Sequence, residues 1–350
     1  MTMAEDRETT GLRRALGSFL PTHFQDPFGL ALRLLRSRSP DAGYAALSAL
    51  LGGLAVPLDL LLVPFERRRL EHAGAPEKPI LFVVGPPRSG TTLVAQTVIR
   101  ALPVAYLTNL TSIFPRAPIT AGRLLRARLA NEKIRPRSHY GRTSRLYGPN
   151  DGLQLWDRWT GGDRTRIPVE LRAAERTAMV RFFGAYEKAH GMPIVAKNNS
   201  LNLYASLVAE ALPTARFVCM RREPLFLAQS LLQARRHIHG SFAIPYGPDS
   251  PDRDASLDPV DDVCAQIRFH EASARQQLQA IGAERFRFVS YETFCDDPAG
   301  FAEEMSDMLG VRMAPDAALP LLTASRRRTL PPEEFARLER AVERAELGGR

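Results

Sequence analysis

The sequence predicts an α/β fold in which a parallel sheet is flanked by helices and preceded by an apolar helical segment. Short, β-rich apolar runs alternate with longer segments of helical character. A glycine-rich turn, GPPRSGTT at residues 85–92, joins the first such run to the first such helix. Hydrophobic residues make up 45% and charged residues 24% of the 350 residues, which is ordinary globular usage and suits a large core.

The order of the expected elements favours a sheet that is covered on both faces. Strands are expected at 78–85, 192–197, 215–222 and 285–294, and helices at 91–102, 200–213, 224–238, 301–310 and 331–346. Strands that alternate with helices pair in parallel, because each helix returns the chain to the same end of the sheet. We therefore expect an α/β domain over residues 76–350 and a helical, partly apolar segment over residues 1–75.

Residues 42–65 form the most apolar part of the chain. Arginines flank this stretch at positions 33, 36 and 38 and at 67–69. Because Gly52, Gly53, Pro57 and Asp59 interrupt it, a membrane-spanning helix is disfavoured. Two alternatives stay open: a helical hairpin packed on the main domain, or an interfacial helix that meets anionic lipid through the arginines.

The charge and the cysteines indicate partners and compartment. The net charge of +9 favours an anionic partner, but no Lys/Arg tract interleaved with aromatic residues marks a nucleic-acid surface. Cys219, Cys264 and Cys295 are widely spaced and form no CxxC pair, which favours a reducing compartment. His237 and His239 are too close together to form a metal site without nearby Cys or carboxylate partners. We expect a cytoplasmic protein without a bound metal, with peripheral contact to the inner face of a membrane as a further expectation.

The turn at 85–92 follows the phosphate-binding pattern G-x-x-x-x-G-K-[ST] at Gly85, Gly90 and Thr92, but Thr91 stands where the lysine belongs. Backbone N–H groups at the start of a helix bind phosphate whatever the side chains are. Arg88 within the loop supplies a fixed cation in place of the lysine, and the threonine hydroxyls can donate hydrogen bonds.

A second motif makes the turn more specific. Arg222-Glu223-Pro224 ends an expected strand, and Ser230 follows eight residues after Arg222. With PPRSGTTL, this pair resembles the nucleotide-binding signature of sulfotransferases that use 3′-phosphoadenosine 5′-phosphosulfate (PAPS), in the bacterial type with a PRSGTT loop and close to the tyrosylprotein sulfotransferase branch. The resemblance implies a P-loop-like fold, PAPS as co-substrate and no metal. It assigns the 5′-phosphosulfate to Arg88, Ser89, Gly90, Thr91 and Thr92, and the 3′-phosphate to Arg222 and Ser230.

The spacing of the second motif agrees with this assignment, because residues eight apart lie on nearly one face of a helix. The resemblance extends to Lys197, which occupies the place of the family's lysine, and to Tyr291-Glu292, which is similar to a late YE element. It implies in-line transfer of a sulfuryl group to an acceptor hydroxyl. Lys197 and Arg88 would then offset the charge that develops on the leaving phosphate.

The general base is where the sequence departs from its relatives. Tyrosylprotein sulfotransferases carry a glutamate where this chain has Asn109, and an amide cannot take the proton of the acceptor hydroxyl. Two substitutes lie in the segment 138–162: His139, and Asp151 in the turn-like PNDG stretch. We favour Asp151, because the same segment carries the tryptophans Trp156 and Trp159, which could line an acceptor pocket.

Another class of function remains open at this point: a P-loop nucleotide kinase, or a nucleotide-binding protein, that has lost its lysine. A kinase would need a carboxylate at a strand end to hold Mg²⁺, whereas the expected strand 215–222 ends in arginines. The acceptor of a sulfotransferase is equally open, whether lipid, glycan or another small molecule.

Overall fold

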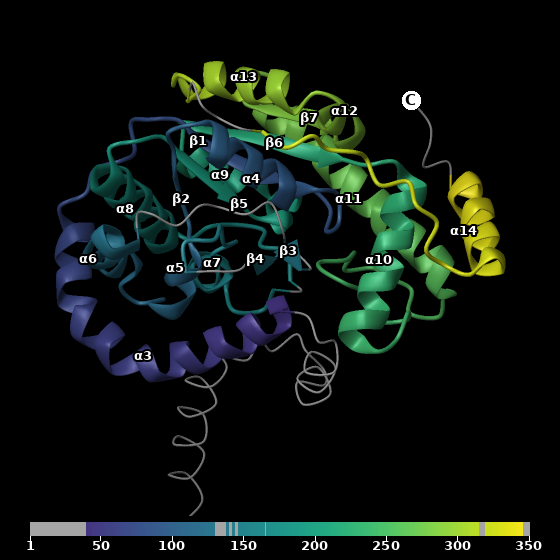
Figure 1. Ribbon diagram of the computed structural model, residues 1–350, viewed down its shortest axis with the longest axis horizontal. Coiled ribbons are helices and arrows are strands. Elements are labelled where there is room, and N and C mark those ends of the chain that lie inside the picture. The colour runs from purple at the N-terminus through teal and green to yellow at the C-terminus, as the bar shows by residue number, and fades with distance from the viewer. Residues whose placement is uncertain are drawn as a thin grey trace, which may run out of the picture.

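The computed structural model describes residues 40–129, 138–139, 142–143, 146–164, 166–314 and 319–345. Its centre is a five-stranded parallel sheet with the strand order β2-β5-β1-β6-β7 (Figure 1). The strands are β2 (Ala105–Tyr106), β5 (Ile194–Lys197), β1 (Ile80–Val84), β6 (Ala215–Arg221) and β7 (Phe286–Ser290). The expected α/β fold with a P-loop-like parallel sheet is thus confirmed.

Strand β1 is central to both halves of the core. All five of its residues are buried, and they alternate between the two faces of the sheet. Phe82 belongs to the cluster that contains Phe183 and Phe217, whereas Val83 belongs to the cluster that contains Val98. Because helices cover both faces of the sheet, the side chains on both faces must be apolar, and the strand therefore reads as a continuous apolar run.

Helices fill both layers. One face of the sheet is covered by α4 (Thr91–Ala101), α12 (Tyr291–Asp296) and α13 (Pro298–Leu309). The other is covered by α7 (Leu153–Thr160), α8 (Ala173–His190), α9 (Ala205–Ala211) and α11 (Pro259–Ile281). A smaller cluster joins α11 to α10 (Pro224–His239) and α14 (Pro332–Arg344), and another joins α3 (Pro40–Glu71), α5 (Asn109–Ile113) and α6 (Pro118–Leu129).

Two expected elements differ from the structure. The helix expected at 200–213 begins as a 3₁₀ turn, η1 (Asn199–Leu203), and becomes α9 only after Tyr204, whose φ of −147° interrupts the helix. The strand expected at 285–294 ends at Ser290. There the serine hydroxyl accepts a hydrogen bond from the backbone N–H of Thr293 and so caps α12.

The apolar segment is one continuous helix, α3, so the first of the two alternatives, a helical hairpin, is wrong for residues 40–71. Proline inside a helix removes one backbone hydrogen bond and bends the axis. Pro57 and Pro64 both lie on the exposed side of α3, where the bend is tolerated and the helix follows the edge of the domain (Figure 1). Within the part of the chain that the structure describes, every helix falls short of the apolar length that a membrane crossing needs.

Helix α3 is held to the domain by two buried carboxylates. Asp59 accepts hydrogen bonds from the backbone N–H groups of Arg116 (3.2 Å) and Ala117 (3.0 Å). Glu66 accepts from the N–H groups of Ile119 (3.1 Å) and Thr120 (2.8 Å). These donors lie at the start of α6, where N–H groups lack partners within the helix. The carboxylates therefore cap α6, and the boundary we expect at residue 75 stays a prediction.

We predict that Glu66→Ala lowers the free energy of unfolding by about 2 kcal/mol, because it leaves buried N–H groups without an acceptor. Urea denaturation followed by circular dichroism measures this. Glu71→Ala is the matched control, because Glu71 is an exposed glutamate on the same helix. Equal effects of the two substitutions would show that the carboxylate of Glu66 does not hold α3 in place.

Candidate active site

The glycine-rich loop lies between β1 and α4 and is packed closely on its neighbours. Gly85 has a φ of +137°, and a Cβ there would lie 2.7 Å from the carbonyl oxygen of Met220 on β6. Gly90 has a φ of +99°, and a Cβ would meet the ring of Tyr291 at 2.4 Å. Both positions therefore require glycine, and the loop is wedged between β6 and α12.

Arg88 has a strained backbone and joins the two motifs. Among the described residues, it is the one non-glycine residue with a positive φ, +73°. Its Nε donates to Ser230 Oγ at 3.1 Å, and its carbonyl oxygen accepts from Arg222 Nη1 at 3.0 Å. Three residues predicted from two distant motifs are thus brought into direct contact.

Arg222 is half-buried and held on several sides. Its guanidinium lies 4.9 Å above the ring of Tyr291, and Nη2 donates to the carbonyl oxygen of Ser325 at 3.0 Å. Its Nε is buried without a hydrogen-bond partner. Burial lowers the pKa of Arg222, and the adjacent charge of Arg88 acts in the same direction, so an anion beside this pair would be stabilised.

The hydroxyls of the loop are also in place. Ser89 is fully buried, and its Oγ has no hydrogen-bond partner. Thr91 Oγ1 donates to Asn199 Oδ1 at 2.9 Å, which ties the start of α4 to the turn that follows β5. Thr92 is half-buried on the first turn of α4. The structure therefore gathers all five predicted loop residues, Arg88 to Thr92, at the start of one helix.

Lys197 and Asp151 form an ion pair, which neither motif indicated. Lys197 Nζ lies 2.6 Å from Asp151 Oδ1, and the side chains are 6% and 24% exposed. Lys197 ends β5, and its register partner is Val83, two residues before the glycine-rich loop. The pair therefore lies beside the glycine-rich loop, at the same end of the sheet.

The segment that carries Asp151 is fixed by a side-chain amide. Asn150 Nδ2 donates to Asn109 Oδ1 at 2.8 Å, and Asn150 Oδ1 accepts from the N–H of Gly152 at 2.7 Å. Asn109, at the place of the relatives' glutamate, therefore supports the segment on which the candidate base lies. No sequence pattern predicts this role, because it depends on an amide pair formed across the fold.

The remaining candidates are placed differently. His139 lies in β3 (Ser138–His139), which pairs with β4 (Arg142–Thr143), but its side chain lies outside what the structure describes. Trp159 is buried against Phe182. Trp156 borders a pocket among the described residues, and Trp159 is not part of that pocket's lining.

Several residues that line this pocket are close in sequence to the two members of the ion pair. Asn198 and Ser200, just after Lys197, form part of its wall, and Leu153, just after Asp151, forms another part. The other lining residues are Trp156, Asp157, Thr160, Asp163, Arg164, Arg166, Ile167, Pro168, Leu203, Tyr204 and Pro248. Its wall therefore mixes polar and apolar side chains.

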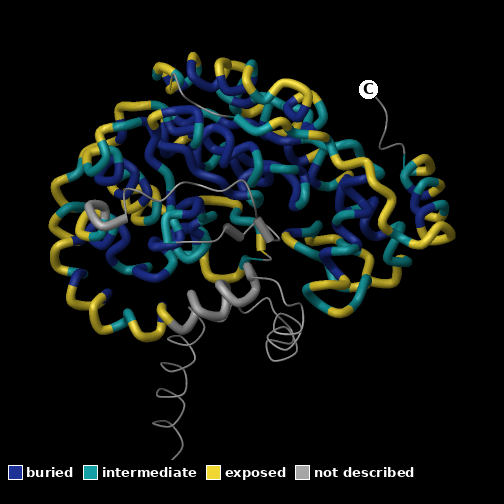
Figure 2. The backbone as a smooth tube through the Cα atoms, in the orientation of Figure 1, coloured by how far each residue is buried: buried dark blue, intermediate teal, exposed yellow. Residues whose placement is uncertain are grey.

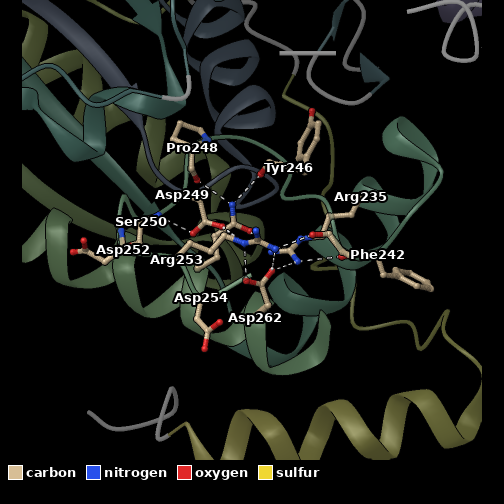
Figure 3. Close-up of polar contacts among 12 residues, drawn as sticks. Arg235, Phe242, Tyr246, Pro248, Asp249, Ser250, Asp252, Arg253, Asp254 and Asp262 are labelled. Carbon is tan, nitrogen blue, oxygen red and sulfur yellow. Dashed lines mark hydrogen bonds and ion pairs between the residues drawn. The ribbon is translucent and has the colours of Figure 1, made fainter. Parts of the chain in front are cut away.

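A buried polar network anchors the loop between α10 and α11, residues 241–258 (Figure 3). Arg235 is fully buried and donates to Asp262 Oδ2 at 2.5 Å and to Gln266 Oε1 at 2.9 Å. Arg253 of the loop also donates to Asp262, at 2.8 Å. Burial lowers the pKa of Arg235, and its hydrogen bond to Asp262 opposes that effect.

The loop 241–258 reaches both the glycine-rich loop and the pocket. Gly247 has a φ of +84°, and a Cβ there would lie 2.4 Å from Pro87. Pro248 lines the pocket, and its carbonyl oxygen is 3.0 Å from His270 Nε2. His270 Nδ1 is 3.0 Å from Asn202 Nδ2, on the turn after Lys197. Both contacts are satisfied by a neutral imidazole with its proton on Nε2.

The fold is a P-loop-like α/β fold, and Arg88, Lys197 and Arg222 lie at or just beyond the carboxyl ends of its central strands. A family model described as the sulfotransferase family matches residues 79–315, more than half of the chain, and the chain belongs to this family. The resemblance seen in the sequence is thereby confirmed. The kinase alternative is not supported. A kinase would need a carboxylate at a strand end to hold Mg²⁺, whereas β6 ends in Arg221, whose guanidinium pairs with Glu271.

Two solved structures show the same fold. The sulfotransferase STF9 from Mycobacterium avium is 15% identical with a TM-score of 0.52, and the match covers 98% of this chain and 88% of that one. The sulfotransferase STF1 from Mycobacterium tuberculosis H37Rv is 16% identical with a TM-score of 0.50, covering 89% of this chain and 90% of that one. No curated protein matches this sequence.

His270 gives a prediction for stability against pH. Burial lowers its pKa from 6.5 to about 4. The folded protein therefore resists protonation that the unfolded chain accepts, so the contribution is complete above pH 6.5 and is lost as the pH falls towards 4. We expect a loss of up to about 3 kcal/mol from this group. Urea denaturation at several pH values should show a shallower pH dependence for His270→Gln, and an unchanged slope would contradict the assignment.

Proposed function

We propose that this enzyme transfers the sulfuryl group of PAPS to a hydroxyl group of an acceptor. The observation that carries the proposal is the contact of Arg88 with both Ser230 and Arg222. Two arginines and a serine, drawn from three elements, meet where the carboxyl ends of β1 and β6 lie side by side. Such a cluster suits a ligand that carries several anionic groups.

The polar groups of the site fit this nucleotide. Ser89 Oγ and Arg222 Nε are buried without partners in the protein, which is costly unless a ligand completes them. Ser89 lies at the start of α4, where backbone N–H groups favour an anion. We assign the 5′-phosphosulfate to the loop residues Arg88 to Thr92, and the 3′-phosphate to Arg222 and Ser230.

The contacts also give Arg88 a double role. Its backbone belongs to the loop assigned to the 5′ end, but its guanidinium reaches Ser230 in the site assigned to the 3′-phosphate. A nucleotide phosphorylated at both ends would satisfy both halves of this arrangement. ATP has no 3′-phosphate, so it would leave Arg222 and Ser230 without an anion.

The reaction follows from the position of the ion pair. PAPS supplies the sulfuryl group: a bond forms between sulfur and the acceptor oxygen, and the bond from sulfur to the 5′-phosphate oxygen breaks. We assign Asp151 as the acceptor of the hydroxyl proton, with His139 as the alternative base. Lys197 and Arg88 stabilise the negative charge on the departing phosphate oxygen. Asp151 and Lys197 already lie 2.6 Å apart, so the two roles fall at one place.

The acceptor enters, in this proposal, through the pocket beside Asn198 and Leu153. We propose that its mixed lining contacts the hydroxyl-bearing end of the acceptor, whether a lipid, a glycan or another small molecule. We place the enzyme in the cytoplasm, because all three cysteines are reduced and buried, with contact to the inner face of a membrane through residues 42–65. We propose no metal and no nucleic acid as partners.

The first prediction of this proposal concerns donor binding. Calorimetric titration with 3′,5′-adenosine diphosphate should show tight binding, and Arg222→Ala should weaken it by about a hundredfold, because a charge-assisted contact with phosphate is lost. ATP with Mg²⁺ is the parallel ligand. If ATP with Mg²⁺ binds more tightly than the bisphosphate, the assignment of the second phosphate site is wrong.

The second prediction concerns turnover. Lys197→Met should abolish it, and Asp151→Asn should lower kcat by a factor of about 10² to 10⁴, because the amide cannot take a proton. Both variants should still bind 3′,5′-adenosine diphosphate measurably. Steady-state assays with PAPS and an acceptor found by screening measure kcat.

His139→Gln serves as the comparison for Asp151→Asn. A fall in kcat with His139→Gln alone would move the base to His139. If neither substitution lowers kcat, the base lies outside the segment 138–162. Unchanged turnover in Lys197→Met would rule out a catalytic role for the lysine.

A further inference from the structure

Helix α3 presents its apolar residues outward. Five exposed apolar side chains recur at intervals of three and four residues and so lie along one face of the helix. They are Leu51, Leu54, Leu58, Leu61 and Phe65. We call this the α3 apolar face; Figure 2 shows the described part of α3 largely exposed along the edge of the molecule.

The polar side chains of this stretch point the other way. Asp59 and Glu66 are buried against the start of α6, together with Leu62. A helix on the surface of a soluble domain normally buries its leucines and exposes its carboxylates. Here the exposed side is broad and apolar, and it carries no acidic residue between residues 51 and 66. Apolar patches of this kind mark surfaces that meet a membrane or another protein.

We infer that the α3 apolar face binds the surface of a membrane rich in anionic lipids. Arg68 is exposed and continues the same face three residues after Phe65, and Arg67 is exposed beside it. Cations at the end of an apolar helix face attract anionic headgroups while the leucines enter the upper part of the bilayer. The inference makes specific the membrane contact proposed above but does not depend on sulfuryl transfer.

The backbone of α3 favours a lipid interface over a second copy of the chain. Pro57 and Pro64 have no N–H, so the carbonyl groups of Gly53 and Leu60 lack their usual helical donors. All four residues lie on the exposed side. In a dry helix–helix contact these carbonyl groups would be buried without donors, whereas headgroup water can satisfy them.

The test is flotation of the full-length protein with vesicles of equal parts phosphatidylglycerol and phosphatidylcholine, compared with phosphatidylcholine alone. The native protein should float preferentially with the anionic vesicles. The double variant Leu54→Gln/Leu61→Gln should weaken this binding by about tenfold or more, because two leucines no longer transfer to the membrane. Arg67→Gln/Arg68→Gln should weaken binding to anionic vesicles by about tenfold and reduce its salt dependence.

Leu321→Gln is the matched control, because Leu321 is a fully exposed leucine on the segment before α14, away from α3 (Figure 1). It should bind as the native protein does. Absence of flotation for the native protein, or equal flotation of the leucine variant, overturns the inference. So does a dimer, seen by light scattering without lipid, that Leu54→Gln/Leu61→Gln dissociates. Flotation needs neither donor nor turnover, so its failure is distinct from a failure of the sulfotransferase assays.

Discussion

The parallel register of three strands is the constraint on which the site depends. With β5 and β6 paired in parallel on either side of β1, the carboxyl ends of all three strands lie at one edge of the sheet. The glycine-rich loop follows β1, Lys197 ends β5, and Arg222 follows β6. The residues of the two motifs therefore meet although 134 residues separate Arg88 from Arg222. Helices on both faces keep this register, because β1 is buried on each side.

The site concentrates positive charge, and the surrounding contacts compensate for it. Arg88 and Arg222 lie together, and repulsion between two cations at a partly buried place opposes folding. The carbonyl oxygen of Arg88, that of Ser325 and the ring of Tyr291 each offset part of this cost. An anionic ligand would offset the rest of this free-energy cost, so the site favours the binding of an anion.

Local patterns could predict the sheet and the two motifs at its edge, but not the side-chain pairs that form across the fold. The apolar runs and the glycine-rich turn specify β1, β5, β6 and α4, because strand burial and loop geometry depend on neighbouring residues. The ion pair of Lys197 with Asp151 depends instead on how the segment after β2 is folded back. Backbone hydrogen bonds and the amide pair of Asn109 with Asn150 hold that segment. Likewise, prolines in a sequence suggest a break, but α3 stays continuous because both lie on its exposed side.

The orientation of α3 follows from the same kind of long-range contact. Asp59 and Glu66 are seven residues apart and therefore lie on one face of the helix, two turns from each other. Because both cap the start of α6, they fix the rotation of α3 about its own axis. Once that rotation is fixed, Leu54, Leu58 and Leu61 must face outward, whatever the cost of exposing them in water. An apolar surface held in place by buried carboxylates cannot be removed by a small turn of the helix, so it stays available to the membrane surface that we infer as its partner.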